Sequence, residues 1–277
     1  MTGHGRFAPQ TPALLRDAGR AIGGALVFSL PMLMTMEMWQ LAYTVQAWRI
    51  AVLVAVAVPL LVGLSHVIGI GRRRKLAETA MDAFFAFGIA AFTSAVVLTA
   101  LGVLAPGMSV DEIIGKIAIQ SVPAAIGALL ARSQLRSGAD ETLGDREETY
   151  AGELFLMMVG ALFLGFNLAP TEEMILISYL MTEWHGIALM AISIAAMHGF
   201  VFAVEFKGGS ELSQDTPWWS ALLRFTLPGY AIAALISLFL LWVFGRTEGL
   251  AIEMVAMAVV VLAFPSAIGA AAARLIL

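Results

Sequence analysis

Long apolar stretches alternate with short polar segments along nearly the whole chain. A helix needs about 20 mostly apolar residues to cross the hydrocarbon core of a bilayer. The period-two alternation of a β-barrel strand is absent from these stretches. The pattern therefore predicts an all-α polytopic membrane protein with eight transmembrane helices, at residues 18–43, 50–70, 79–104, 110–131, 154–179, 186–206, 219–244 and 251–275.

The composition supports this class and excludes several others. Of the 277 residues, 60% are hydrophobic and 13% are charged, whereas about 25% of residues are charged in soluble proteins. So few charges cannot cover a water-exposed surface, which excludes a soluble enzyme and a disordered protein. The net charge is -4 and no basic tract is present, so we expect the lipid bilayer and not nucleic acid as a partner. The absence of cysteine excludes disulfides and thiolate metal sites.

Lysine and arginine are concentrated in alternate polar segments, and this bias sets the expected orientation. The cation-rich segments hold Arg6, Arg16, Arg20, Arg72, Arg73, Arg74, Lys75, Arg132, Arg136, Arg146 and Lys207. The other face holds little more than Arg49, Arg246 and Lys116. We therefore expect both termini to be cytoplasmic, and we read the first apolar stretch as a retained span and not a cleaved signal.

A shift of 136 residues aligns the two halves of the chain. The pairs that match without a gap are Gly24–Gly160, Thr35–Thr171, Glu37–Glu173, Met38–Met174, Trp48–Trp184 and Gly63–Gly199. With a slightly longer offset, the Pro-x-Ala-Ile-Gly pattern at 123–127 matches the one at 265–269. The sequence thus predicts a first repeat at 1–132, a cytoplasmic linker at 133–150 and a second repeat at 151–277.

Four spans in each repeat would return the chain to its starting side of the membrane. Both repeats would then have the same orientation and would be related by a pseudo-two-fold axis along the membrane normal. A pathway across the membrane is expected on such an axis.

Carboxylates inside apolar stretches are the strongest candidates for functional residues, because a charge is costly within a membrane. The segment 167–174 reads Asn-Leu-Ala-Pro-Thr-Glu-Glu-Met. Pro170 interrupts the helix and frees backbone carbonyl groups that can coordinate ions. Asn167 and Thr171 add side-chain oxygens, and Thr35 takes the position of Thr171 in the first repeat.

Glu37 and Glu173 occupy matched positions and would face each other near the axis, with Glu172 beside them. Such carboxylates attract cations, and their hard oxygen atoms suit Ca²⁺, Mg²⁺ or Mn²⁺. Close carboxylates also titrate as a pair, which would suit coupling to protons. In the alternative interpretation, these glutamates lie at the outer interface and are simply solvated.

Three further ionisable residues could form a proton relay. His198 lies in the middle of its span, Glu205 follows seven residues later on the same face, and Asp82 begins the third span. A packed, hydrogen-bonded histidine and an ion pair at the cytoplasmic face are the alternatives.

The segment from Asn167 to Glu173 resembles the Asn-x-Ala-Pro-Thr-Glu-Glu motif of a bacterial family of integral membrane proteins of unknown function. The span count and the polar linker in the middle of the chain also fit that family, so the resemblance covers most of the chain. It implies a multi-pass protein of the bacterial inner membrane and supplies no activity.

The residues favour a cation channel or cation transporter with a carboxylate-lined pathway between the repeats. No cofactor is expected other than a bound cation, either divalent or monovalent. The first alternative is an intramembrane enzyme that resembles CAAX-type proteases. Those enzymes use Glu-Glu-x-x-x-Arg and two histidine motifs, whereas Ile177 stands four residues after Glu173 here and no second histidine follows His198. We therefore do not expect an enzyme. The second alternative is a membrane sensor without transport, and the sequence leaves open whether the chain forms a homo-oligomer.

Overall fold

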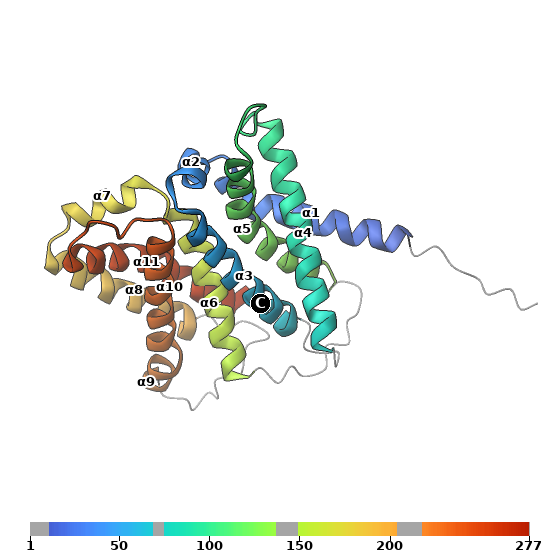
Figure 1. Ribbon diagram of the computed structural model, residues 1–277. Helices are drawn as coiled ribbons and strands as arrows, with labels where there is room; N and C mark the ends of the chain where they lie inside the picture. Colours follow the sequence, from blue (N-terminus) through green and yellow to red (C-terminus); the bar gives the residue numbers. More distant parts are fainter. Residues whose placement is uncertain (1–10, 69–74, 137–148, 204–217, 277) are drawn as a thin grey trace, which may run out of the picture.

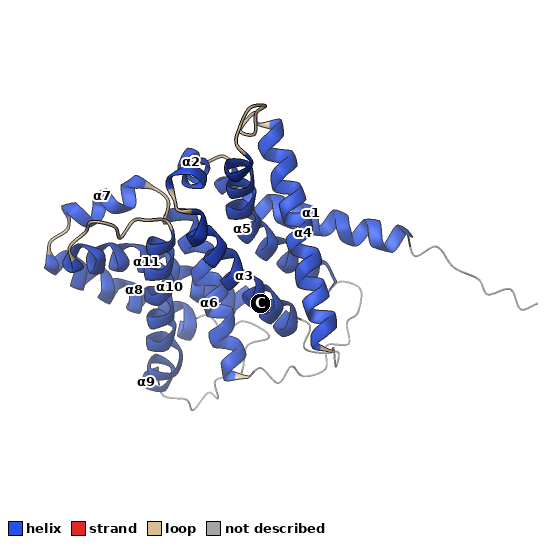
Figure 2. Cartoon of the chain, viewed as in Figure 1, coloured by secondary structure: helices blue, strands red, loops and turns tan. Residues whose placement is uncertain are grey.

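The computed structural model describes residues 11–68, 75–136, 149–203 and 218–276, and every regular element in these ranges is helical (Figures 1 and 2). The helices are α1 (Thr11–Leu33), α2 (Met36–Thr44), α3 (Ala47–Ile68), α4 (Leu76–Ala100), α5 (Val110–Arg136), α6 (Tyr150–Leu168), α7 (Glu172–Leu180), α8 (Glu183–Ala203), α9 (Trp218–Ala221), the π-helical turn η1 (Leu222–Thr226), α10 (Leu227–Val243) and α11 (Ile252–Ile276). Several residues of the sequence analysis lie outside these ranges: Arg6, Arg72, Arg73, Arg74, Arg146, Glu205, Lys207 and most of the linker 133–150.

Six of the helices in these ranges are long and apolar enough to cross a membrane, and the bent pair α1–α2 makes a seventh if it is counted as one span. The six are α3, α4, α5, α6, the segment Trp219–Val243 and α11. The predicted stretch 186–206 falls on α8 and on residues beyond the described part of the chain. The all-α class and the multiple spans are therefore confirmed, with six to seven candidate spans in place of the predicted eight.

The first predicted span, 18–43, is two helices and not one. The segment Ala18–Leu33 and α2 meet at an angle of 80°. Pro31 lies inside the last turn of α1 and cannot donate a hydrogen bond to the carbonyl of the preceding turn, which weakens the helix just before the break. Thr35 has extended backbone angles (φ -97°, ψ 119°), and its hydroxyl donates a hydrogen bond to the carbonyl of Pro31 at 2.5 Å. The chain thus turns sharply and restarts a helix at Met36.

The predicted span 154–179 is interrupted in the same manner. α6 ends at Leu168, Thr171 is extended (φ -71°, ψ 143°), and α7 begins at Glu172. The interruption predicted at Pro170 is therefore present, and it ends the helix instead of kinking it. In Figure 1, α2 and α7 both lie toward the upper edge, at the end of α6 opposite to α9.

Close glycine contacts hold the helices of each half together. A Cβ atom on Gly24 of α1 would clash with the carbonyl group of Gly127 on α5, and a Cβ atom on Gly160 of α6 would clash with the carbonyl group of Gly269 on α11. Without side chains, the backbones approach closely, which is how many membrane helices pack. One apolar core runs through helices of both halves, and a smaller cluster lies among α6, α8, α10 and α11.

Contacts between the halves are made mainly by α3, which packs against α6 and α10. Phe155 of α6 lies against Gly63 of α3, and the rings of Phe28 and Phe163 are 5.1 Å apart. A two-fold axis would require α8 to contact α1 in return. Among the described residues, α1 and α8 make no contact as extensive as that of α3 with α6, and a Cβ atom on Gly199 of α8 would meet no described atom within 4 Å. The contact of α3 with α6 thus has no counterpart of similar extent among the described helices, and the pseudo-two-fold axis stays a prediction.

Candidate functional site

A polar cleft of about 310 Å³ lies where the two halves meet. One wall comes from α2, the turn after it and the start of α3; the other comes from the start of α7 and the segment between α10 and α11. The residues that line it are Glu37, Gln40, Leu41, Thr44, Val45, Gln46, Arg49, Glu172, Phe244, Gly245, Arg246 and Glu248. Segments distant in sequence thus form one site.

Two of the predicted carboxylates line this cleft. Glu37 is half-buried in the first turn of α2, and Glu172 is exposed at the first position of α7. Both lie at helix N-termini, whose partial positive charge stabilises a carboxylate. Neither carboxylate makes a hydrogen bond or an ion pair with any described residue, so both negative charges remain available in the cleft.

Glu173 is exposed but is not among the residues that line the cleft. Adjacent residues of a helix project about 100° apart. Once α7 begins at Glu172, only one of the two glutamates can face the cleft. The matched pair of the sequence, Glu37 with Glu173, is thus not the pair that the cleft brings together.

Arg49 connects the two halves beneath these carboxylates. It is 9% exposed, and its Nη1 atom donates a hydrogen bond to the Trp242 carbonyl at 2.8 Å. Its guanidinium group also forms an ion pair with Glu248 and lies 5.5 and 5.4 Å from the ring centres of Trp48 and Trp242. Cation–π contacts of this kind add to the pairing. The positive charge of Arg49, from the first half, is therefore held against the second half.

Arg246 contributes the second positive charge of the cleft. Its guanidinium group donates a hydrogen bond to the carbonyl of Pro170, at the break between α6 and α7. The Nε atoms of Arg49 and Arg246 are buried and have no hydrogen-bond partner among the described residues. Three carboxylates against two guanidinium groups leave the cleft with one excess negative charge.

Protein donors already occupy several carbonyl groups at the helix breaks. The indole of Trp39 donates to the Leu33 carbonyl at 2.8 Å, and the Gln120 amide donates to the Met32 carbonyl at 2.9 Å. At the second break, the Thr171 hydroxyl donates to Leu168 at 2.8 Å. The proposed acceptor Asn167 uses its Nδ2 atom to donate to the Phe163 carbonyl at 2.8 Å.

In the described conformation, the polar side chains at the helix breaks stabilise the breaks through hydrogen bonds. Thr35, Thr171 and Pro170 shape the breaks, and none of the three lines the cleft. Among the described residues, moreover, no three His, Asp or Glu side chains cluster closely enough to hold a metal ion. Glu37, Glu172 and Glu173 therefore do not form a three-carboxylate metal site here.

The predicted proton-relay residues lie away from the cleft. His198 of α8 shares a hydrogen bond of 2.9 Å with the Thr226 hydroxyl, at the end of the π-helical turn η1. Asp82 is half-buried in α4, and Glu205 lies outside the described residues. Of these residues, His198 and Asp82 are not among the cleft residues.

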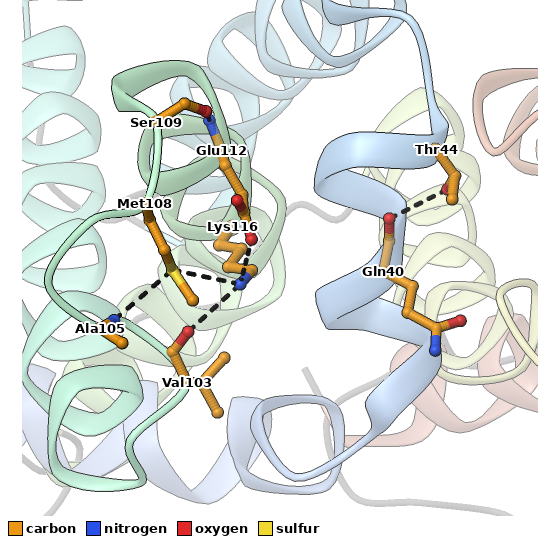
Figure 3. Close-up of polar contacts among 8 residues, drawn as sticks. All are labelled: Gln40, Thr44, Val103, Ala105, Met108, Ser109, Glu112 and Lys116. Carbon is orange, nitrogen blue, oxygen red and sulfur yellow. Dashed lines mark hydrogen bonds and ion pairs between the residues drawn. The ribbon is translucent and has the colours of Figure 1, made fainter.

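Lys116, the buried cation of α5, ties the loop after α4 to the protein. Its Nζ atom lies 2.7 Å from a carboxylate oxygen of Glu112 and donates to the Val103 carbonyl at 3.2 Å (Figure 3). Figure 3 also shows Gln40 and Thr44 on the neighbouring α2, where the Thr44 hydroxyl donates to the Gln40 carbonyl at 3.0 Å. Lys116 thus supports the helix that carries one wall of the cleft.

Sequence reasoning missed Arg49, Arg246 and Glu248 as site residues. They come from α3 and from the segment after α10, which the fold brings together. One available signal was that Arg49 and Arg246 are among the few cations on the cation-poor face, and that Glu248 stands two residues from Arg246.

A scan of protein families matches residues 17–277 to the family described as "Putative integral membrane protein (DUF2391)". The chain belongs to this family. It is therefore a multi-pass integral membrane protein, and the bilayer surrounds it. A search of curated proteins and a search of solved structures found no match. The expected class of protein is confirmed by the family, which assigns no activity to the cleft.

Proposed function

We propose that the protein is a cation channel or cation transporter and that the cleft between its halves is the site where a cation enters. The observation that carries this proposal is the pair Glu37 and Glu172, two unpaired carboxylates on opposite walls of the cleft. Together with Glu248 they place three carboxylates in the cleft, one more than the guanidinium groups of Arg49 and Arg246 neutralise. Negative charge focused in a cleft attracts cations and repels anions.

The proposal includes two parallel repeats, with both termini in the cytoplasm of a bacterium and the cleft on the outer side of its inner membrane. The lysine and arginine bias supports this orientation, since the cleft residues come from the cation-poor side. Support for the repeats comes from the bounds of α2 (Met36–Thr44) and α7 (Glu172–Leu180), which differ by the same 136 residues as the sequence match. The two close glycine pairs also occupy matched positions.

In this proposal the described conformation is the closed one. Leu41 and Phe244 line its apolar part and belong to the buried core. A cation therefore crosses only after the halves rearrange. The Nε atoms of Arg49 and Arg246 have no hydrogen-bond partner among the described residues, so both guanidinium groups could form further hydrogen bonds in a rearranged conformation.

The test is ion flux into proteoliposomes across a panel of monovalent and divalent cations, with and without a pH gradient. Glu37→Gln and Glu172→Gln keep the size of each side chain and remove its charge. We expect each to lower flux about tenfold, since the loss of about 1.4 kcal/mol of binding free energy changes affinity tenfold. The double variant should nearly abolish flux, and a dependence on the pH gradient would establish proton coupling.

Glu173→Gln is the matched control, because it removes the same charge from the neighbouring residue, which does not line the cleft. Its flux should stay near that of the unaltered protein. If Glu37→Gln/Glu172→Gln folds normally and transports normally, the cleft is not the site. If Glu173→Gln is the more damaging single change, the pair matched in the sequence is the functional one.

A further inference from the structure

We propose that the cleft between the halves binds a small organic cation that carries two ammonium groups and one carboxylate, which is the chemistry of a basic amino acid. This inference rests on the proposed function, because it takes the same cleft as the site where a cation enters. It adds the chemical class of that cation, which the two unpaired glutamates alone do not specify.

The volume of the cleft suits a small organic molecule. Pockets that bind such molecules have volumes of about 300–1,000 Å³, and this cleft has about 310 Å³. A metal ion such as Ca²⁺ takes about 6–8 oxygen ligands in direct contact. In the described ranges, no three His, Asp or Glu side chains lie close enough together to begin such a shell. The cleft is therefore larger than a dedicated metal site and has its carboxylates farther apart.

The unpaired acceptors of the cleft suit ammonium groups. Glu37 and Glu172 line opposite walls, and neither carboxylate has a partner among the described residues. An ammonium group has three N–H donors and needs only one carboxylate to form a charge-assisted hydrogen bond. Two carboxylates on opposite walls therefore favour two ammonium groups on one molecule.

The cleft also contains donors that a simple cation leaves unused. Arg246 donates one hydrogen bond through Nη2, to the Pro170 carbonyl, and its Nη1 atom has no partner among the described residues. The side-chain amide of Gln40 also has no described partner, and Figure 3 shows it pointing away from Lys116. Arg49 is 9% exposed, and its Nε atom is unpaired in the described part of the chain. Because guanidinium groups bind carboxylates well, these donors favour a carboxylate on the bound molecule.

The net charge of the cleft fits this combination of groups. Three carboxylates and two guanidinium groups leave one excess negative charge, and two ammonium groups with one carboxylate carry one excess positive charge. A diamine would place uncompensated positive charge near Arg246, and a molecule with one ammonium group would leave one glutamate unpaired. Leu41 and Phe244 add an apolar surface against which the methylene groups of the bound molecule can pack.

Isothermal titration calorimetry on the purified full chain tests the proposal with lysine and two compounds that have the same carbon chain. Cadaverine lacks the carboxylate of lysine, and ε-aminocaproate lacks its α-ammonium group. We expect lysine to bind and each of the other two to bind at least about tenfold more weakly, because a hydrogen bond between charged groups is worth at least that factor in affinity. Equal binding of lysine and either compound would contradict the proposal.

Arg246→Gln tests which residue recognises the carboxylate. It should weaken the binding of lysine about tenfold and leave the binding of cadaverine unchanged or stronger, and Arg246→Lys should restore part of the loss. A purely structural role of Arg246 would weaken both compounds alike and would contradict this assignment. If Arg246→Gln does not fold, Gln40→Met takes its place, since the Gln40 side chain has no described partner to lose.

Glu37→Gln should weaken lysine and cadaverine alike, because both compounds present ammonium groups. Glu173→Gln is the matched control and should change neither, since Glu173 does not line the cleft. If lysine does not bind while Glu37→Gln and Glu172→Gln lower the flux of inorganic cations, this inference is wrong and the proposed function stands. If the three compounds bind as expected and no cation crosses the membrane, lysine included, the cleft recognises this ligand without transport and the proposed function is wrong.

Discussion

α3 and α8 each carry a tryptophan at the second position and a glycine near the other end, and these matched residues have different surroundings. Trp48 and Gly63 of α3 contact the other half of the chain, whereas Trp184 and Gly199 of α8 are exposed. The contacts inside each half do not differ in this way, because Gly24 meets Gly127 as Gly160 meets Gly269. The comparison teaches that matched sequences specify matched packing inside each half, while the contacts between the halves depend on which surface stands next to each helix.

The largest expected loss of stability tests whether the matched glycine contacts inside the two halves are equivalent. In Gly24→Leu or Gly160→Leu, the new side chain would meet the backbone of the facing helix, which cannot move aside. Each variant should lose about 3 kcal/mol or more of stability, at the upper end of overpacking costs. Thermal stability in detergent, followed by size-exclusion chromatography, measures the loss.

Gly88→Leu is the control for these variants, since no atom in the described part of the chain lies within 4 Å of a Cβ atom at that position of α4. It should fold like the unaltered protein. Loss in one half but not in the other would mean that the two glycine contacts are not equivalent.

A loss of stability of intermediate size should distinguish α3 from α8. Arg49→Met removes a hydrogen bond from a charged group, an ion pair and two cation–π contacts. The ion pair adds little, because the Glu248 side chain is 59% exposed. We expect a loss of about 2 kcal/mol, since a hydrogen bond to a charged group contributes about 1.5–3 kcal/mol. Thermal unfolding of the purified protein checks this loss.

The matched change is His185→Met at the start of α8. The described partner of its side chain is Thr182, three residues away, at 2.9 Å from the hydroxyl. The loss should stay within about 0.5 kcal/mol, as for most surface substitutions. Equal losses in the two variants would remove the distinction between α3 and α8.

The smallest expected change in stability should have opposite signs in α3 and α8. In Gly63→Ala, the new methyl group would press against the Phe155 ring, so a loss of about 1 kcal/mol is expected from overpacking. In Gly199→Ala, no described atom lies within 4 Å of the methyl group, and the better helix propensity of alanine should add about 0.5–1 kcal/mol. Both changes are measured by thermal unfolding of the detergent-solubilised monomer.

The sequence by itself determined the class of protein, the approximate spans and the place of the second helix break. Hydropathy indicates spans because the bilayer requires long apolar segments. The missing N–H group of Pro170 favours a break at that point, although Pro59, Pro123 and Pro265 lie inside continuous helices. The matched halves were also visible, since Thr, Glu, Trp and Gly recur 136 residues apart.

Only the tertiary structure decided which charges share the cleft. Whether Glu172 or Glu173 faces it depends on the residue at which α7 begins, since one step along a helix turns a side chain by about 100°. Arg49, Arg246 and Glu248 meet because α3 packs on α10, and that packing follows from the surfaces of both helices and not from a local pattern. The 80° bend after Leu33 likewise needs Trp39 and Gln120 to hold the carbonyl groups at the break. Local residues thus determine where helices start and stop, and long-range packing determines what their ends meet.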